Sequence, residues 1–159
     1  MEQLTPIVIT DTDEGAQSVS EVFLGGRLEV TSRSGISLTE ARLLEALASF
    51  PSPAGKLLVL GNRTGVLAMA AVVCIPGLAA EVSSMDLHHH RAVERNLARN
   101  PCPWVSSRCE PDVRERGHYD IVCLQVSKGS FSDELIQDLL QQCHQALKKG
   151  GRCFVASEE

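Results

Sequence analysis

Short apolar runs alternate with stretches of helical periodicity from residue 56 to residue 156. The apolar runs have the length and composition of buried strands, and Gly or Pro residues punctuate the stretches between them. Five strands are predicted, at Lys56–Leu60, Ala79–Met85, Trp104–Cys109, Tyr119–Leu124 and Arg152–Ala156. Three helices are predicted between them, at Val66–Cys74, His88–Asn100 and Phe131–Lys148, the last ending at Gly150-Gly151. This rhythm is typical of a three-layer α/β fold with a mostly parallel sheet.

The first third of the chain has a different pattern. A short strand is predicted at Pro6–Thr10, and a hairpin is predicted where Gly25-Gly26 separates Val22–Leu24 from Arg27–Thr31. Apolar residues at helical spacing predict a helix over Glu40–Phe50, with Ser37 or Thr39 as its N-cap and Pro51-Ser-Pro53 after it. We therefore expect residues 1–54 to form a hairpin-and-helix extension of an α/β domain at 55–159, the two making one compact unit.

Composition narrows the class of protein. The chain has 159 residues, of which 43% are hydrophobic, so it has one domain's length and enough apolar side chains for a core. No apolar run approaches the ~20 residues of a membrane span, and no secretory signal is visible. We expect a cytoplasmic protein without metal whose six scattered cysteines are reduced thiols. The net charge of −5 argues against a broad phosphate-binding surface.

Candidate chemistry gathers where the first two strands of the α/β unit end. In parallel sheets, ligands bind beyond the carboxyl ends of the strands, and glycines there let backbone approach a ligand closely. The second strand ends at Asp86, and an acid at this point can accept hydrogen bonds from both ribose hydroxyls of an adenosine ligand. The predicted binding residues are Gly61, Asn62, Arg63, Thr64, Gly65, Asp86 and Leu87. Their spacing is not GxGxxG, which disfavours a dinucleotide fold.

Residues 57–69, LLVLGNRTGVLAM, resemble the first motif of class I S-adenosylmethionine (SAM) methyltransferases, which often reads VLDLGCGTGVLAL. Asp86 with 92–96 resembles the second motif, while 119–122 and 147–155 resemble the fourth and fifth strands. The resemblance covers roughly residues 55–156 and implies a Rossmann-like methyltransferase sheet with SAM as cofactor. Residues 28–37 and 40–47 are similar to a segment before the methyltransferase small domain of bacterial ribosomal RNA guanine-N2 methyltransferases, which implies ribosomal RNA as a partner.

The chain departs from that family pattern at three places. Val59 stands where the family has an acid, and Arg63 stands where it has a glycine. A long cation at 63 should intrude on the space of the methionine part of SAM, or swing out and bind an anion. Residues 124–129 do not match the family's Asn-Pro-Pro-Phe/Tyr signature, so Gln125 is the candidate for the amide that holds the target amine. Asp112 either contacts the adenine amine or lies in a surface loop.

The resemblance leaves two functions open. The family often pairs a degenerate N-terminal module with a catalytic one, and Ser127-Lys128 resembles the Pro-Lys of the degenerate module. The chain is therefore either a SAM-dependent methyltransferase-like domain whose cofactor binding is weak or lost, or a non-catalytic module that supports a catalytic partner or positions RNA. A different adenosine-ligand binder is a third possibility. A second methyltransferase domain, or a second copy of the chain, is expected along the fifth strand unless residues 1–31 cover that edge.

Two conspicuous groups of side chains have simpler interpretations. Consecutive helical residues point about 100° apart, so His88, His89 and His90 cannot share one face and are predicted to be solvated rather than metal-binding. His88 or His89 could still lie near an adenine, because they follow Asp86. Trp104 lies beside prolines and is predicted to anchor the core.

Overall fold

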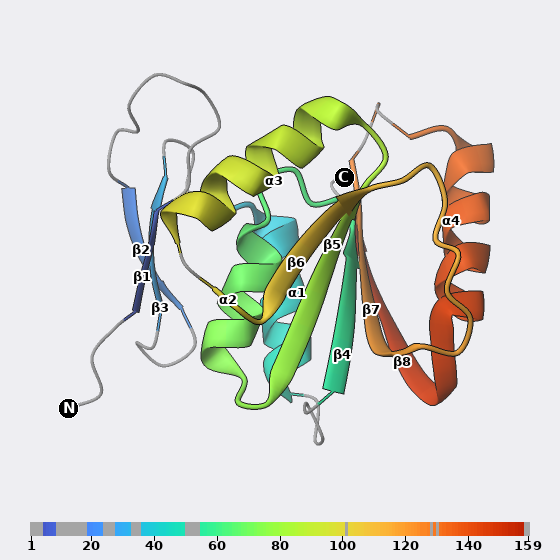
Figure 1. The fold of residues 1–159 in the computed structure, drawn as a ribbon, viewed down its shortest axis with the longest axis horizontal. Helices are drawn as coiled ribbons and strands as arrows, with labels where there is room; N and C mark the ends of the chain where they lie inside the picture. The colour runs from blue at the N-terminus through green and yellow to red at the C-terminus, as the bar shows by residue number, and fades with distance from the viewer. Residues whose placement is uncertain are drawn as a thin grey trace.

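A five-stranded parallel sheet forms the centre of the protein (Figure 1). The computed structural model describes residues 5–8, 19–23, 28–32, 36–49, 55–100, 102–127, 129 and 131–157. The strand order is β6-β5-β4-β7-β8. The strands are β4 (Gly55–Leu60), β5 (Leu78–Ser84), β6 (Val105–Cys109), β7 (Tyr119–Val126) and β8 (Leu147–Ser157). The order changes direction at β4, so the ends of β4 and β7 form the switch point of the sheet.

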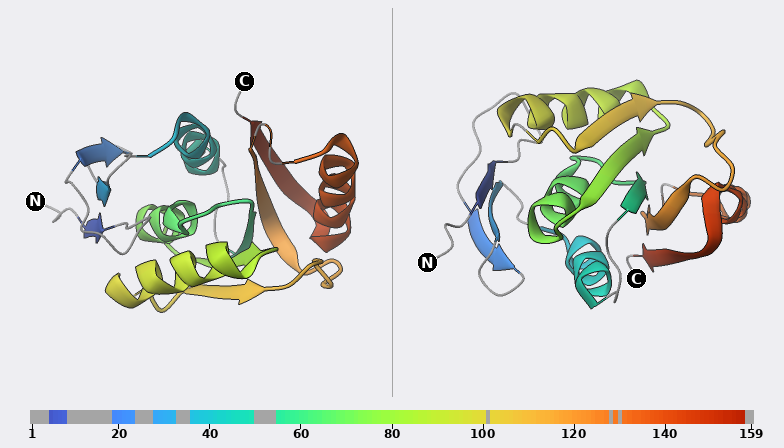
Figure 2. Two further views of the ribbon diagram at one scale, coloured as in Figure 1. Left: turned by 90° about the horizontal axis from the view of Figure 1, so that it is seen from above. Right: turned by 60° about the horizontal axis from the view of Figure 1, so that its bottom comes forward.

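Helices cover both faces of this sheet, which confirms the predicted three-layer α/β fold (Figure 2). The helices are α1 (Leu38–Ser49), α2 (Val66–Cys74), α3 (Leu87–Arg99) and α4 (Asp133–Ala146). Helices α1, α2 and α3 pack on one face, and α4 packs on the other against β7 and β8. Within the described residues, no helix joins β6 to β7, so α4 is the only described helix that packs on its face of the sheet.

The strand β4 shows why the apolar runs do not alternate with polar residues. Leu57 and Val59 face α1 and α2, whereas Leu58 and Leu60 face the α4 side. All four side chains are buried, as expected for a parallel strand with packed layers on both of its faces. This rigid central strand carries the Gly-Asn-Arg-Thr-Gly turn at its carboxyl end.

The first residues of α1 form a capping box. The Ser37 hydroxyl accepts a hydrogen bond from the Glu40 backbone N–H at 3.2 Å, and the Ser37 N–H donates to Glu40 Oε1 at 2.9 Å. This reciprocal pair satisfies donors that a helix start would otherwise leave unpaired. Of the two N-caps the sequence left open, Ser37 is therefore the one used, and Thr39 lies inside the helix.

A separate three-stranded sheet precedes α1. It has the order β1-β3-β2, with β1 (Thr5–Val8), β2 (Val19–Phe23) and β3 (Leu28–Ser32). Strands β2 and β3 are antiparallel, which confirms the hairpin, although the glycines of its turn lie outside the described residues. The Val8 backbone N–H donates to Asn100 Oδ1 at 2.8 Å, and Asn100 Nδ2 donates to the Val8 carbonyl at 2.7 Å.

This small sheet lies beside α2 and α3, on the opposite side of the molecule from β8 (Figure 1). The expectation that strands from residues 1–31 could cover the edge of the fifth strand is therefore wrong for the three described strands. The reason is that β1 is tied to the end of α3 through Asn100, and β1 and β3 contact α2. In the described sheet, β8 pairs with β7 alone and is an edge strand.

The end of α4 differs from the prediction. The helix ends at Ala146, and β8 begins at the next residue instead of after Gly150-Gly151. Tyr119 pairs with Leu147, while Ile121 pairs with Arg152, so the residues between form an irregularity in the strand. Gly150 has a φ of 82° there. The prediction of a glycine helix stop was wrong because the glycines serve a bulge, where a positive φ is also needed.

Candidate functional site

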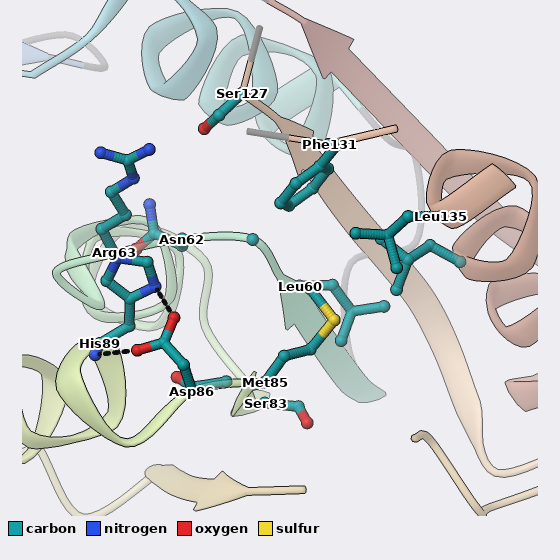
Figure 3. A pocket seen from close by; sticks show the side chains of 13 residues that line it. Leu60, Asn62, Arg63, Ser83, Met85, Asp86, His89, Ser127, Phe131 and Leu135 are labelled. Carbon is teal, nitrogen blue, oxygen red and sulfur yellow. Dashed lines mark hydrogen bonds and ion pairs between the residues drawn. The ribbon is translucent and has the colours of Figure 1, made fainter. Parts of the chain in front are cut away.

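A cavity of about 230 Å³ lies at the carboxyl ends of the strands, beside the switch point of the sheet. Three parts of the chain line it, as Figure 3 shows: the end of β4, the end of β5 with the start of α3, and the segment from β7 into α4. The lining residues are Leu60, Gly61, Asn62, Arg63, Ser83, Ser84, Met85, Asp86, His89, Ser127, Phe131, Leu135 and Leu139.

The sequence predicted part of this lining. Four predicted residues line the cavity: Gly61, Asn62, Arg63 and Asp86. The other predicted residues, Thr64, Gly65, Leu87, Asp112 and Gln125, lie outside its lining. Leu87 is the first residue of α3 and is half exposed, and Asp112 is exposed in the segment between β6 and β7. Their roles toward a ligand remain predictions.

The two glycines of the turn are required by the protein's own packing. Gly61 has a φ of 80°, and a Cβ there would lie 2.0 Å from the Gln125 carbonyl oxygen. Gly65 has a φ of 81°, is the N-cap of α2, and a Cβ there would lie 3.0 Å from Val93 Cγ1. Each glycine thus combines a left-handed conformation with a close approach to a neighbouring element. The turn is held tightly against β7 and α3, which fixes the position of the residues between the glycines.

Asn62 is the centre of a buried polar network beneath the cavity. Its Nδ2 donates to Glu40 Oε2 at 2.8 Å and to Gln125 Oε1 at 2.9 Å. Its Oδ1 accepts from the Leu67 backbone N–H at 3.5 Å. Asn62, Glu40 and Gln125 are each at least nine-tenths buried. The network therefore ties the turn after β4 to the start of α1 and the end of β7.

Gln125, the candidate catalytic amide, belongs to this network. Its Oε1 accepts from Asn62, and its Nε2 donates to Thr39 Oγ1 at 2.9 Å and to Ser37 Oγ at 3.4 Å. Both ends of the amide are thus engaged by side chains of the protein. In this arrangement Gln125 positions α1 against the sheet, and its contact with a target amine stays a prediction.

Asp86 caps α3 at the rim of the cavity. Its Oδ1 accepts from the His89 backbone N–H at 2.8 Å, and its Oδ2 lies 2.7 Å from His89 Nδ1 (Figure 3). The carboxylate is half exposed, and each of its oxygens has further lone pairs. Asp86 can therefore accept ribose hydroxyls only by sharing its oxygens with His89.

Arg63 and Val59 occupy different surroundings, although both depart from the methyltransferase pattern. Arg63 lines the cavity, and in Figure 3 its guanidinium turns away from Leu60 and Met85. Val59 is fully buried in the apolar cluster beneath α1 and α2 and does not line the cavity. Compared with the methyltransferase pattern, Arg63 alters the lining of the cavity itself, whereas Val59 alters the buried packing of β4 before the turn.

Sequence reasoning missed the apolar walls of the cavity. Met85 and Leu60 form one side, and Phe131 and Leu135 form the other (Figure 3). Met85 directly precedes Asp86, so its place in the sequence was a usable signal. Phe131 and Leu135 belong to the segment that enters α4, and only the packing of α4 on the sheet brings them to this place.

Other kinds of site have little support in the described part of the chain. No group of three His, Cys, Asp or Glu residues there could hold a metal ion. His88 and His89 have ring centroids 5.9 Å apart, and His90 Nε2 lies 4.0 Å from Glu94 Oε1. The six cysteines are free thiols. No described helix has the length and hydropathy that a membrane span requires.

Several solved methyltransferases have a similar fold. The ribosomal protein L11 methylase of Lactobacillus delbrueckii subsp. bulgaricus matches 94% of this chain and 73% of its own, with 17% identity and a TM-score of 0.67. The tRNA methyltransferase TrmK of B. subtilis matches 76% of this chain and 49% of its own, with 14% identity and a TM-score of 0.59. Geranyl diphosphate methyltransferase, solved with sinefungin, matches 74% and 43%, with 19% identity and a TM-score of 0.60.

These likenesses define the class of fold. The chain has the Rossmann-like α/β fold of class I SAM-dependent methyltransferases, as its sequence motifs predicted. No protein-family model and no curated protein matches the sequence. The chain spans roughly half the length of TrmK and of geranyl diphosphate methyltransferase, and 55% of the structure of an S-adenosyl-L-methionine-dependent methyltransferase from Methanococcus maripaludis.

Proposed function

We propose that the chain is a methyltransferase-fold module, related to ribosomal RNA guanine-N2 methyltransferases, whose cofactor site is degenerate. In this proposal the module positions RNA or supports a catalytic domain and does not itself transfer a methyl group. The observation that carries the proposal is Arg63, a cation that lines the cavity at the glycine-bounded turn. The relationship to RNA enzymes is supported by the resemblance of residues 28–37 and 40–47, and the tRNA methyltransferase among the structural matches is compatible with it.

The adenosine end of SAM fits the residues present. Asp86 lies at the rim with lone pairs that can accept ribose hydroxyls. Leu60, Met85 and Phe131 provide apolar surface for a planar base, which is the usual lining of a cofactor site. Bound there, SAM would supply an electrophilic methyl group. The chain's own part would be to hold the ribose through Asp86 and to exclude water with these apolar side chains.

The methionine end of SAM fits poorly. This part of SAM carries a cationic sulfonium, a cationic ammonium and one carboxylate, so it is positive overall, and Arg63 brings another positive charge to the same cavity. Asp86 is the only acid among the described lining residues, and it already interacts with His89. Like charges that share a partly enclosed site raise each other's free energy. We therefore expect SAM to bind weakly or not at all.

A catalytic methyltransferase is the second candidate, favoured by the amide of Gln125 at the end of β7. For this activity the chain would have to position a base amine in line with the transferred methyl group. Gln125 would first have to break its hydrogen bonds to Asn62 and Thr39. Two buried hydrogen bonds of the side-chain amide would be lost in that step, which makes this candidate the weaker one.

A methyl-transfer assay separates the two candidates. The chain is incubated with SAM carrying a labelled methyl group and with deproteinised ribosomal RNA, and RNA binding is measured in parallel by filter retention. The proposal predicts RNA retention without label in the RNA. Label incorporation that is lost in Asp86→Ala but kept in the surface control Glu45→Ala would overturn it in favour of the enzyme.

A further inference from the structure

A second cavity, of about 200 Å³, lies at the opposite end of the sheet from the candidate cofactor site. It is lined near the amino ends of β4, β5, β6 and β7 by residues that include Lys56, Glu81, Trp104, Ser106 and Tyr119. Tyr119 begins the segment 119–122 that resembles the fourth methyltransferase strand, but the proposed cofactor site uses none of these residues. The cavity therefore needs its own explanation.

The cavity exists because α4 covers only part of its face. Register pairs Leu58 with Glu81 and Glu81 with Ser106, so these residues point to the face on which α4 packs. Helix α4 contacts β7 and β8 on that face. Residues 110–118, which join β6 to β7, contain no helix that could cover β5 and β6. Parallel strands are usually joined by a helix, so this part of the sheet is unusually open.

A hydrogen-bonded network fixes the polar floor of the cavity. The Tyr119 hydroxyl donates to Glu81, and Arg108 donates to the Tyr119 oxygen at 3.2 Å and to Glu115 at 2.7 Å. Burial, together with the hydrogen bond to Glu81, raises the pKa of Tyr119, so the phenol remains a donor at neutral pH. The Glu81 carboxylate is thus held in one place. Its Oε2 accepts from Tyr119, and its Oε1 takes no part in that hydrogen bond.

Trp104 forms an exposed aromatic wall beside this carboxylate. The prediction that it anchors the core was wrong, because 66% of the residue's surface is accessible. Its backbone carbonyl accepts the Ala80 N–H at 2.8 Å, and this bond fixes the residue at the start of β6 while its ring remains on the surface. An exposed indole next to a polar cavity provides a face on which a planar ring can stack.

We propose that this second cavity binds an unstacked nucleobase of single-stranded RNA. The ring stacks on Trp104, and N–H groups on the edge of the base donate to Glu81. Lys56, whose Nζ lies 3.4 Å from His118 Nε2, is exposed at the rim. In the proposed complex its ammonium group pairs with a phosphate of the bound RNA. Guanine fits best because its neighbouring N1–H and N2–H groups are both donors, whereas the other bases present fewer donors together. The choice of RNA as the source of the base rests on the proposed function; the site itself does not.

Trp104 is the only tryptophan of the chain, so its fluorescence reports on this cavity alone. The whole chain is titrated with GMP, AMP, CMP and UMP, with free N-acetyltryptophanamide as the correction for light absorbed by the nucleotides. We expect saturable quenching that is strongest with GMP. In Glu81→Gln, GMP affinity falls about fivefold, because a charged acceptor becomes neutral, while AMP affinity changes less. The matched control Glu45→Gln changes a paired surface carboxylate on α1 and leaves both affinities unchanged.

A second measurement covers the aromatic wall. Trp104→Leu is followed by equilibrium dialysis with labelled GMP, and circular dichroism checks that the exposed substitution leaves the fold intact. GMP binding is expected to be lost. Absence of saturable quenching with every nucleotide, or equal GMP affinity in the parent and Glu81→Gln, would overturn the site. Because Arg63 and Asp86 lie in the other cavity, the SAM and methyl-transfer assays test the proposed function separately.

Discussion

Replacing Asn62 by alanine tests whether the buried network holds the turn beneath the candidate cofactor site. The substitution removes two donated hydrogen bonds, one to the Glu40 carboxylate and one to the Gln125 amide oxygen. It also removes the weaker acceptor for the Leu67 N–H. Both oxygens therefore lose the donor that Asn62 supplies inside the protein.

The expected loss of stability follows from burial. Glu40 and Gln125 are 8% and 9% exposed, so water reaches their oxygens poorly. A hydrogen bond to a charged group contributes roughly 1.5–3 kcal/mol and a neutral one roughly 1 kcal/mol. Asn62→Ala should therefore lower the free energy of unfolding by about 3 kcal/mol. In the double mutant Asn62→Ala/Glu40→Ala the cost should be less than additive, because the orphaned carboxylate is also gone.

Urea unfolding followed by circular dichroism measures this difference. With an m-value on the order of 2 kcal/mol/M, the midpoint should fall by about 1.5 M without a change in slope. The control Glu45→Ala removes an exposed i,i+3 pair with Arg42 and should cost less than about 1 kcal/mol. A loss in Asn62→Ala no larger than in this control, or strict additivity with Glu40→Ala, would refute the reasoning about the network.

Three further changes test other parts of the structure. Gly61→Ala should lower the free energy of unfolding by more than about 2 kcal/mol in the same assay, because it combines a φ of 80° with a 2.0 Å clash against Gln125; a neutral result would contradict the turn geometry. The hydrogen bond from Arg108 lowers the pKa of Glu115 to about 2, so this pair stabilises the fold above pH ~4.5 and should lose its contribution as the pH falls toward ~2. At neutral pH, Glu115→Gln should lower the free energy of unfolding by an amount on the order of 1–2 kcal/mol, because both groups are partly exposed. Thermal unfolding in acid should show no difference in stability between the parent and Glu115→Gln. If the edge strand β8 docks a second copy, light scattering should show concentration-dependent association that Val155→Lys abolishes, since Val155 is 48% exposed; a parent that stays monomeric at high concentration would count against docking at this edge.

The strands and helices of the α/β unit could be predicted from the sequence because local pattern and burial agree there. The helix at Val66–Cys74 has the predicted bounds, and β4 differs by one residue. The end of α4 could not be predicted, because a glycine pair suits a helix stop and a strand bulge equally well. Pairing of Leu147 with Tyr119, a contact between distant residues, decides between them.

The candidate site was predictable where it lies next to a motif and not where distant segments meet. Gly61 and Asp86 follow strands, so their place at the sheet edge follows from the topology. The union of Glu40, Asn62 and Gln125 joins three segments that no local pattern connects. Trp104 was misplaced because an aromatic residue beside prolines normally packs inward, whereas the described segment between β6 and β7 contains no helix that could cover it.

Calorimetric titration of SAM into the parent chain tests the central claim, a methyltransferase fold whose cofactor site is degenerate. The account predicts a dissociation constant weaker than ~10 µM, corresponding to less than about 7 kcal/mol of binding free energy. Arg63→Gly should strengthen binding, because it removes the cation and restores a small residue at the turn, and Asp86→Ala in that background should weaken it again. A dissociation constant at or below ~10 µM in the parent would contradict the claim.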